Sequence, residues 1–182
     1  MIIEKTKIPE VLIITPRVFE DNRSFFMETW NSEAFAKAGI NADFVQDNHS
    51  LSVKNTLRGI HYQINQPQGK LVRVTGGVVF DLAVDLRKSS KSFGSWVGNI
   101  IDSENKKMLW IPPGFGHAFF VLSDEAELKY KCTNFYYPEF ERCVAWNDAK
   151  LAVKWPLEEK KSPLLSAKDQ QGVSLELADL YE

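Results

Sequence analysis

The chain has 182 residues, 44% of them hydrophobic, and its 22 basic and 24 acidic residues give a formal charge of −2. This length suits one domain with a buried core, and the balanced charge argues against a nucleic-acid or anionic-membrane partner. The opening MIIEKTKIPE lacks a secretory signal pattern and no run of about 18 apolar residues occurs, so we expect a cytoplasmic protein. Two cysteines, Cys132 and Cys143, are too few for a disulfide framework, and we expect both to be buried thiols.

The first expected element is a helix at residues 31–40, NSEAFAKAGI. Asn31 or Ser32 is its candidate N-cap, and Gly39 stands where such a helix ends.

Short strands dominate the rest of the chain. Period-two alternation of apolar and polar residues, typical of half-buried strands, is strongest in three segments: 78–86, 117–122 and 127–134. Gly and Pro turn signals separate four more expected strands: 44–51, 56–63, 70–74 and 107–111. This pattern favours a mainly β sandwich or barrel. We expect a single domain, 1–182, whose polar tail, about 157–182, wraps the outside as loop and short helix.

Arg58 and His61 stand inside the expected strand TLRGIHYQ. Strict alternation would place them on opposite faces. Gly59 lies between them, and a glycine inside a strand often marks a bulge, which would turn both side chains toward one cavity. An exposed edge strand carrying a surface histidine is the alternative.

Three more polar side chains are expected to point inward. His117 follows a Pro-Pro-Gly turn at the start of a strand, Tyr130 alternates with two lysines, and Lys70 begins the strand after NQPQG. Taken singly, His117 and Tyr130 have a structural alternative as ordinary core residues. Burying these groups together is costly unless a polar ligand meets them. A histidine, a tyrosine and cations suit proton transfer as base, acid and partners for an anionic oxygen.

A series of motifs occurs in order from about residue 8 to Asp169: VFEDNRSFFMETW, FVQDNHS, LRGIHYQ, QGKLVRV, FDLAVDLRKSS, LWIPPGFGHAF, YKCTNFYYPEFE and LSAKD. In these motifs and their order the chain resembles the dTDP-4-dehydrorhamnose 3,5-epimerase family. Two departures are small: Ser24 replaces the family's usual glycine, and the turn before His117 reads PPGFGHA. The resemblance implies a cupin-type jelly roll (double-stranded β-helix), a homodimer with N-terminal strand exchange, and no metal or nicotinamide cofactor.

The resemblance also implies a reaction. The family inverts C3 and C5 of dTDP-4-dehydro-6-deoxy-D-xylo-hexose to give dTDP-4-dehydro-L-rhamnose, a step in dTDP-L-rhamnose biosynthesis. Both carbons flank the C4 ketone, so removing either proton gives an enolate with its charge on O4. By resemblance His61 is the base, Lys70 lies near O4, and Tyr130 returns a proton to the opposite face. A carboxylate should orient His61; Asp169 is the first candidate and Asp81 the second.

A set of substrate-binding residues follows from the same resemblance: Arg23, Arg58, His117 and Lys168 at or near the phosphates, Glu28, Gln46, Asn48 and Glu141 at the sugar or nucleotide, and Tyr136 stacked on the thymine. The apolar stretch IPEVLIITPRVF, residues 8–19, is expected to add a strand to a partner's sheet.

Three other functions remain open. A metal-dependent cupin would use His49, His61 and His117 as ligands, although the sequence has no HxH motif. A related dTDP-4-keto-sugar 3-epimerase or 3,4-ketoisomerase would redirect the same enolate. A catalytically silent sugar-nucleotide binding module would not need all the catalytic candidates.

Overall fold

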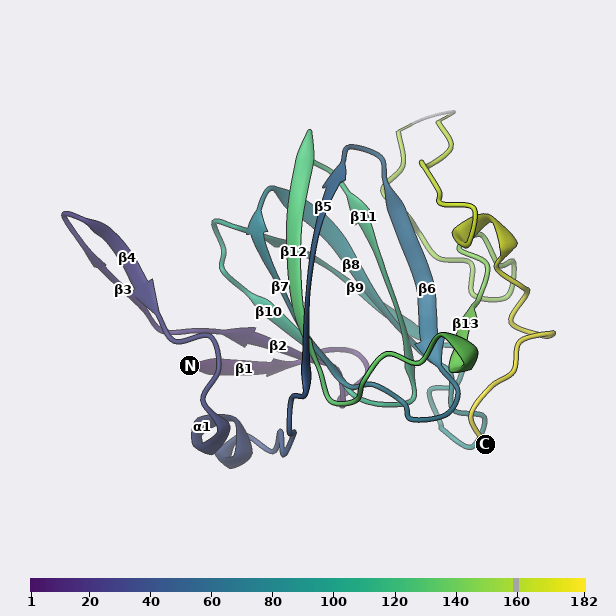
Figure 1. The fold of residues 1–182 in the computed structure, drawn as a ribbon, viewed down its shortest axis with the longest axis horizontal. Coiled ribbons are helices and arrows are strands. Elements are labelled where there is room, and N and C mark those ends of the chain that lie inside the picture. Colours follow the sequence, from purple (N-terminus) through teal and green to yellow (C-terminus); the bar gives the residue numbers. More distant parts are fainter. Residues whose placement is uncertain (159–160) are drawn as a thin grey trace.

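The computed structural model describes residues 1–158 and 161–182, in which two large antiparallel sheets face each other and a third, two-stranded sheet stands apart (Figure 1). Within these residues the strands are β1 (Ile2–Lys5), β2 (Leu12–Thr15), β3 (Val18–Asp21), β4 (Ser24–Met27), β5 (Gln46–Val53), β6 (Leu57–Gln63), β7 (Lys70–Gly76), β8 (Val78–Asp85), β9 (Trp96–Asp102), β10 (Met108–Ile111), β11 (Phe115–Val121), β12 (Glu125–Cys132) and β13 (Glu141–Cys143). The helices are α1 (Ser32–Lys37) and the short 3-10 helices η1 (Pro138–Phe140) and η2 (Asp169–Gln171).

The larger sheet has the strand order β1-β2-β10-β7-β12-β5, and the second sheet has the order β13-β6-β11-β8-β9. In each sheet, strands that are far apart in the chain lie next to each other, and the two sheets pack face to face. This arrangement confirms the predicted mainly β, cupin-type jelly roll. All seven segments predicted as strands from the sequence are present, with their ends shifted by a few residues.

An apolar core fills part of the space between the two sheets. Leu109 and Leu128 from the larger sheet pack in one cluster with Val79 and Ala83 from the second sheet. Alternation along β8 sends Leu82 to the other face of the second sheet, where a separate apolar cluster forms. The second sheet is therefore buried on both faces.

Helix α1 begins and ends where the sequence predicts. The Asn31 side chain accepts a hydrogen bond from the Ala34 N–H (3.0 Å), and Gly39, just past the helix, has a φ of +85° that suits a glycine. Phe35 is buried and packs with Trp110 of the larger sheet. The helix thus covers the outer face of that sheet near β10.

The apolar stretch 8–19 contains β2, which pairs with two strands of its own chain. β2 pairs with β10, with Leu12 opposite Trp110, and β1 occupies the other edge of β2. The chain reverses between β1 and β2 at a turn in which the Val11 N–H donates to the Ile8 carbonyl (2.9 Å). Both edges of β2 are therefore filled locally.

The β3–β4 hairpin projects away from both sheets (Figure 1). Phe25 and Phe26 on this hairpin are 51% and 70% exposed, which is unusual for neighbouring aromatic side chains.

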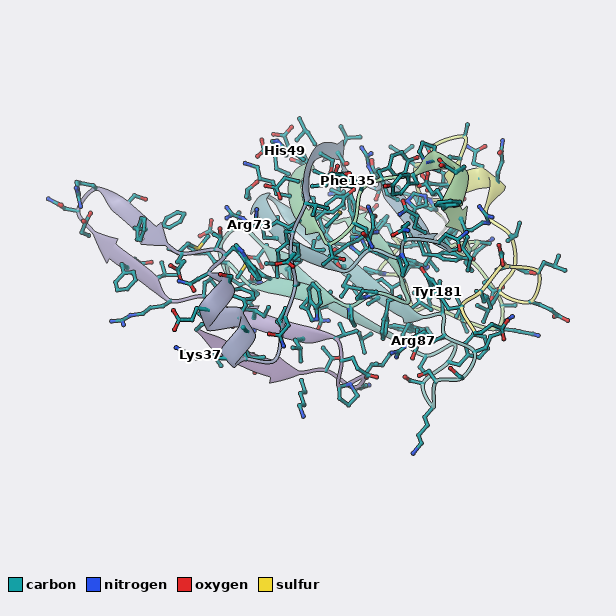
Figure 2. All side chains as sticks on the ribbon, turned by 60° about the horizontal axis from the view of Figure 1, so that its bottom comes forward. Lys37, His49, Arg73, Arg87, Phe135 and Tyr181 are labelled. Atoms are coloured by element: carbon teal, nitrogen blue, oxygen red, sulfur yellow. The ribbon has the colours of Figure 1, made fainter. Side chains whose placement is uncertain are left out.

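The C-terminal residues 161–182 lie against the second sheet. Leu175 and Leu180 pack in the cluster on its outer face. Arg87 and Tyr181, which lie close together in Figure 2, form a β-bridge, and the Tyr181 hydroxyl donates to the Gln63 carbonyl (2.7 Å). Among the described residues, no helix combines the length and apolar character needed to cross a membrane.

Candidate active site

A bulge in β6 sets the orientation of two candidate residues. His61 pairs with His117 and Arg58 pairs with Phe119, so Gly59 and Ile60 together stand opposite the single residue Ala118. This shift confirms the predicted bulge. Gly59 has a φ of +116°, and a Cβ there would lie 2.5 Å from the Ala118 Cβ. Only glycine fits this position.

Because of the bulge, Arg58 and His61 line one cavity of about 330 Å³ between the two sheets, although they lie three residues apart. A cavity of roughly 300 to 1,000 Å³ is the usual size for a small-molecule site. Most of the candidate residues line this cavity: Gln46, Asn48, Arg58, His61, Lys70, His117, Tyr130, Tyr136, Glu141 and Lys168. Strands from both sheets contribute, so the cavity is built by the packing of the jelly roll.

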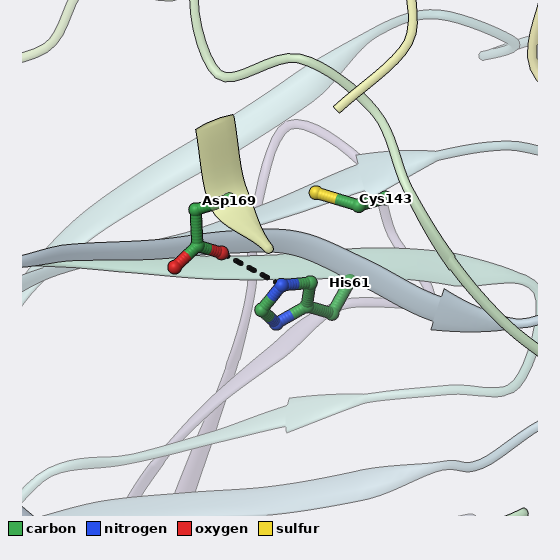
Figure 3. A group of neighbouring side chains, drawn as sticks. All are labelled: His61, Cys143 and Asp169. Carbon is green, nitrogen blue, oxygen red and sulfur yellow. Dashed lines mark ion pairs between the residues drawn. The ribbon is translucent and has the colours of Figure 1, made fainter. Parts of the chain in front are cut away.

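Asp169 lies directly behind His61 (Figure 3). Its Oδ1 is 2.7 Å from His61 Nε2, although the ring N–H does not point squarely at that oxygen. The Gly59 N–H donates to Oδ1 (3.0 Å) and the Ser166 hydroxyl donates to Oδ2 (2.6 Å). Burial opposes ionisation of Asp169, but the contacts with His61, Ser166 and the Gly59 amide outweigh it and lower its pKa to about 2. An ionised carboxylate therefore faces the imidazole.

Asp81 faces the other inward histidine. Its two carboxylate oxygens lie 3.1 and 3.0 Å from His117 Nε2, and both side chains are buried. Of the two carboxylates considered for His61, Asp169 is the one that contacts it.

Tyr130 and Lys70 enter the cavity from the larger sheet. Burial raises the pKa of Tyr130 to about 12, so the phenol keeps its proton at neutral pH. Lys70 Nζ lies 5.9 Å from the centre of the Tyr130 ring. Burial lowers the pKa of the Lys70 ammonium, while the nearby Cys132, Asp81 and Glu141 oppose that shift. A phenol and an amine thus stand on the side of the cavity opposite His61.

Three candidate residues form a polar group at the rim. The Tyr136 hydroxyl donates to Glu141 Oε2 (2.5 Å), and Lys168 Nζ contacts the same oxygen. Burial disfavours the Glu141 charge, but the bonds from Lys168 and Tyr136 outweigh it and lower the Glu141 pKa. Tyr136 is 46% exposed, which leaves part of its ring open to a ligand.

Arg23 and Glu28 are the two candidates that the single chain does not bring to the cavity. Arg23 lies at the turn of the β3–β4 hairpin, where it pairs with Asp21 (2.5 Å) and its side chain is 85% exposed. Glu28 follows the same hairpin and accepts a hydrogen bond from Asn31 (3.1 Å).

Sequence analysis missed two residues that support the site. Ser166 holds the Asp169 carboxylate, and its only signal is its position in the LSAKD motif. Gln63 lies in phase with His61 on β6; its amide accepts from the Tyr137 N–H (2.9 Å) and donates to the Phe135 carbonyl (3.1 Å), which anchors the loop that carries Tyr136.

The three histidines do not converge. Gln46, Asn48 and Ser50 on β5 line the cavity, whereas His49, between them, lies on the other face with Glu127 3.5 Å away. Figure 2 shows His49 near the outer edge of the molecule. A metal centre built from His49, His61 and His117 does not fit this geometry.

The fold and the cavity define a cupin-like protein with a polar site between its sheets. Residues 5–176 match the family model of dTDP-4-dehydrorhamnose 3,5-epimerase, and the chain belongs to that family. It is 55% identical, over 96% of both chains, to the dTDP-4-dehydrorhamnose 3,5-epimerase of Pseudomonas aeruginosa, and 53% identical, over 97% of both, to that of Shigella flexneri. A Legionella pneumophila dTDP-6-deoxy-D-glucose-3,5-epimerase solved with dTDP-4-keto-L-rhamnose superposes with a TM-score of 0.94 at 48% identity, over 97% of this chain and 94% of that one.

Proposed function

We propose that this chain inverts C3 and C5 of dTDP-4-dehydro-6-deoxy-D-xylo-hexose to give dTDP-4-dehydro-L-rhamnose. The observation that carries the proposal is the placement of His61 on β6 and Tyr130 on β12, which enter one cavity from opposing sheets. Inversion at carbon needs proton removal from one face and proton delivery to the other. Two proton-transfer groups on facing sheets meet that need.

His61 acts as the general base at each carbon. It takes a proton from C3 or C5, and the electron pair of the broken C–H bond moves through the adjacent carbonyl carbon to O4 as an enolate. Lys70 lies near O4 and stabilises its negative charge. A positioned base contributes on the order of 10² to 10⁴ in rate, and one well-placed donor to the oxyanion on the order of 10² to 10³.

Tyr130 acts as the general acid. It donates its phenolic proton to the other face of the enolate, which restores the C4 ketone with the carbon inverted. Solvent then returns a proton to Tyr130 and removes the one held by His61. The raised pKa of Tyr130 supports this role, because the phenol is protonated before each delivery. These side chains supply every step, so the proposed reaction uses no metal or nicotinamide.

Asp169 orients His61 in this proposal, and Asp81 orients His117 beside it. Arg58, His117 and Lys168 offer positive charge to the pyrophosphate. Tyr136 stacks on the thymine, and a set of polar residues contacts the sugar or nucleotide: Gln46, Asn48 and Glu141.

A homodimer completes the proposed site. The hairpin that carries Arg23 projects from its own chain, and its exposed Phe25 and Phe26 form an apolar surface that a partner would cover. Exchange of this hairpin between two chains would bring Arg23 and Glu28 to the partner's cavity. A cytoplasmic location belongs to the same proposal, because the two free cysteines suit a reducing compartment.

The deciding experiment is proton NMR of the reaction in D₂O, starting from dTDP-4-dehydro-6-deoxy-D-xylo-hexose. The proposal predicts that deuterium replaces hydrogen at both C3 and C5 and that the product has the L configuration. Exchange and inversion at C3 alone would identify a 3-epimerase, a shift of the ketone to C3 would identify a 3,4-ketoisomerase, and no exchange would identify a binding module.

A further inference from the structure

Cys143 is a residue near the base to which the proposed reaction gives no role. It lies on β13 directly opposite His61 on β6. Directly opposed residues of antiparallel strands project from the same face, with Cβ atoms about 4.5 to 5.5 Å apart. The register therefore places a thiol beside the imidazole.

Asp169 adds a third donor to this pair from outside the sheet. The ligand atoms of His61, Cys143 and Asp169 all lie within 4.8 Å of one another, and Figure 3 shows the three side chains next to one another. The Asp169 carboxylate is already held by Ser166 and the Gly59 amide. Such hydrogen bonds to a ligating carboxylate are the usual support around a metal site.

We propose that His61, Cys143 and Asp169 bind a thiophilic divalent cation such as Zn²⁺, and that the bound ion blocks the proposed reaction. Imidazole, thiolate and carboxylate are all zinc ligands, at about 2.0 to 2.3 Å. Binding breaks the S–H bond of Cys143, releases its proton to solvent and forms a metal–sulfur bond. The thiolate and the carboxylate together balance the charge of the ion.

Ligand atoms of a tetrahedral zinc site lie about 3.3 to 3.8 Å apart. The widest pair here, at up to 4.8 Å, must therefore close by about an ångström, whereas His61 Nε2 and Asp169 Oδ1, 2.7 Å apart, must separate slightly. The His61 side chain is 25% exposed and borders the cavity, so its ring has room to move toward the sulfur. Three protein ligands leave the fourth tetrahedral position for a water molecule from the cavity. The soft sulfur favours Zn²⁺ and Cd²⁺ over Mg²⁺ and Ca²⁺.

Inhibition follows from the ring nitrogen that the ion occupies, and this part rests on the proposed function. Coordination removes the free imidazole that accepts the substrate proton and turns the Asp169 carboxylate from the ring to the ion. The bound ion should therefore inhibit the reaction rather than assist it, and a chelator that removes the ion should restore full activity.

The test is a titration of the intact protein with Cd²⁺, followed by the ultraviolet charge-transfer absorption of a cadmium–thiolate bond. The parent should bind one Cd²⁺ with this absorption. Cys143→Ser should lose the absorption and weaken Cd²⁺ binding more than about tenfold. Cys132→Ser is the matched control, because Cys132 is the other cysteine and lies on the larger sheet; it should keep both signals. Cys143→Ala, with a melting curve for every variant, guards against a folding defect.

Any one of three results would overturn the proposed site. They are a parent that binds no Cd²⁺, a Cys143→Ser variant that keeps the absorption, and a Cys132→Ser variant that loses it. With activity as the second measurement, Zn²⁺ should inhibit the parent and Cys132→Ser, and should inhibit Cys143→Ser only at concentrations more than about tenfold higher. Cd²⁺ binding through Cys143 in a protein without epimerase activity would sustain the site and refute the proposed function, so the two failures are distinguishable.

Discussion

Arg58 and His61 face the same cavity although three residues separate them on one strand. The bulge at Gly59 directs both side chains to the same face of β6. The Gly59 amide also donates a hydrogen bond to the Asp169 carboxylate that lies behind His61. One backbone irregularity thus sets the direction of a cation and an imidazole and fixes the imidazole's carboxylate partner.

The first prediction concerns this bulge. Gly59→Ala should lower the free energy of unfolding by roughly 1 to 3 kcal/mol, because the new Cβ meets Ala118 and φ is positive. Activity should fall further than stability explains, since Arg58 and His61 lose their common phase. Urea unfolding and turnover check both effects. Gly76→Ala is the control, because its Cβ would meet ordinary contacts of 3.6 Å; equal behaviour of the two variants would contradict the role of the bulge.

The second prediction concerns the base. His61→Asn should reduce turnover by on the order of 10² to 10⁴, because it removes the proposed general base but keeps a polar side chain of similar size. Binding of dTDP, measured by calorimetry, should stay near the parent value. His49→Asn, on the other face of β5, should leave turnover unchanged. Deuterium entering C3 and C5 at the parent rate in His61→Asn would exclude His61 as the base.

The third prediction concerns Asp169 and acid stability. Its pKa is lowered from 3.8 to about 2 in the folded chain, so its contribution to stability is present above about pH 4 and is lost as the pH falls toward 2. A shift of this size corresponds to about 2 kcal/mol. In Asp169→Asn, the unfolding free energy should be lower at pH 7 and should change less between pH 4 and pH 2. Asp124→Asn, at a fully exposed side chain, serves as the control; a parent-like pH dependence in Asp169→Asn would count against the stabilised carboxylate.

The fourth prediction concerns the proposed exchange of the β3–β4 hairpin between two chains. Arg23→Ala and His61→Asn should each be weakly active alone. Mixing the two proteins, with unfolding and refolding to exchange chains, should restore activity, because each mixed dimer then has one cavity with His61 from one chain and Arg23 from the other. A mixture no more active than its separate components would show that Arg23 does not act across a dimer.

The sequence predicted the strands of the central sheets because their inward and outward residues alternate, as in β8, β11 and β12. It predicted α1 because Asn31 and Gly39 mark its ends. It did not predict β9. Gly98 lies inside this strand and interrupts the alternation of apolar and polar side chains, and a Cβ at this position would lie 2.1 Å from the Phe80 ring. This packing comes from another strand and leaves no periodic signal.

The residue types of the site could be predicted from the sequence, but the contacts between those residues could be predicted only in part. Period and turn signals placed His117 and Tyr130 on inward faces, and Gly59 indicated a bulge that could turn His61 inward, but these signals carry no information on which distant carboxylate reaches which histidine. Asp169 follows His61 by more than a hundred residues and meets it only after the tail has packed on β6. The same limit applies to the β2 stretch, whose apolar character indicates pairing but does not specify the partner strand.

The most direct test of the account is the partition between exchange and inversion in Tyr130→Phe, followed by proton NMR in D₂O. His61 can still form the enolate in this variant, but the opposite face has lost its acid, so the enolate should recover a proton or deuteron from the His61 side. The account predicts that deuterium enters the substrate faster than L-configured product forms, whereas the parent couples the two. Inversion of both centres at the parent rate in Tyr130→Phe would contradict the assignment of base and acid to opposing sheets.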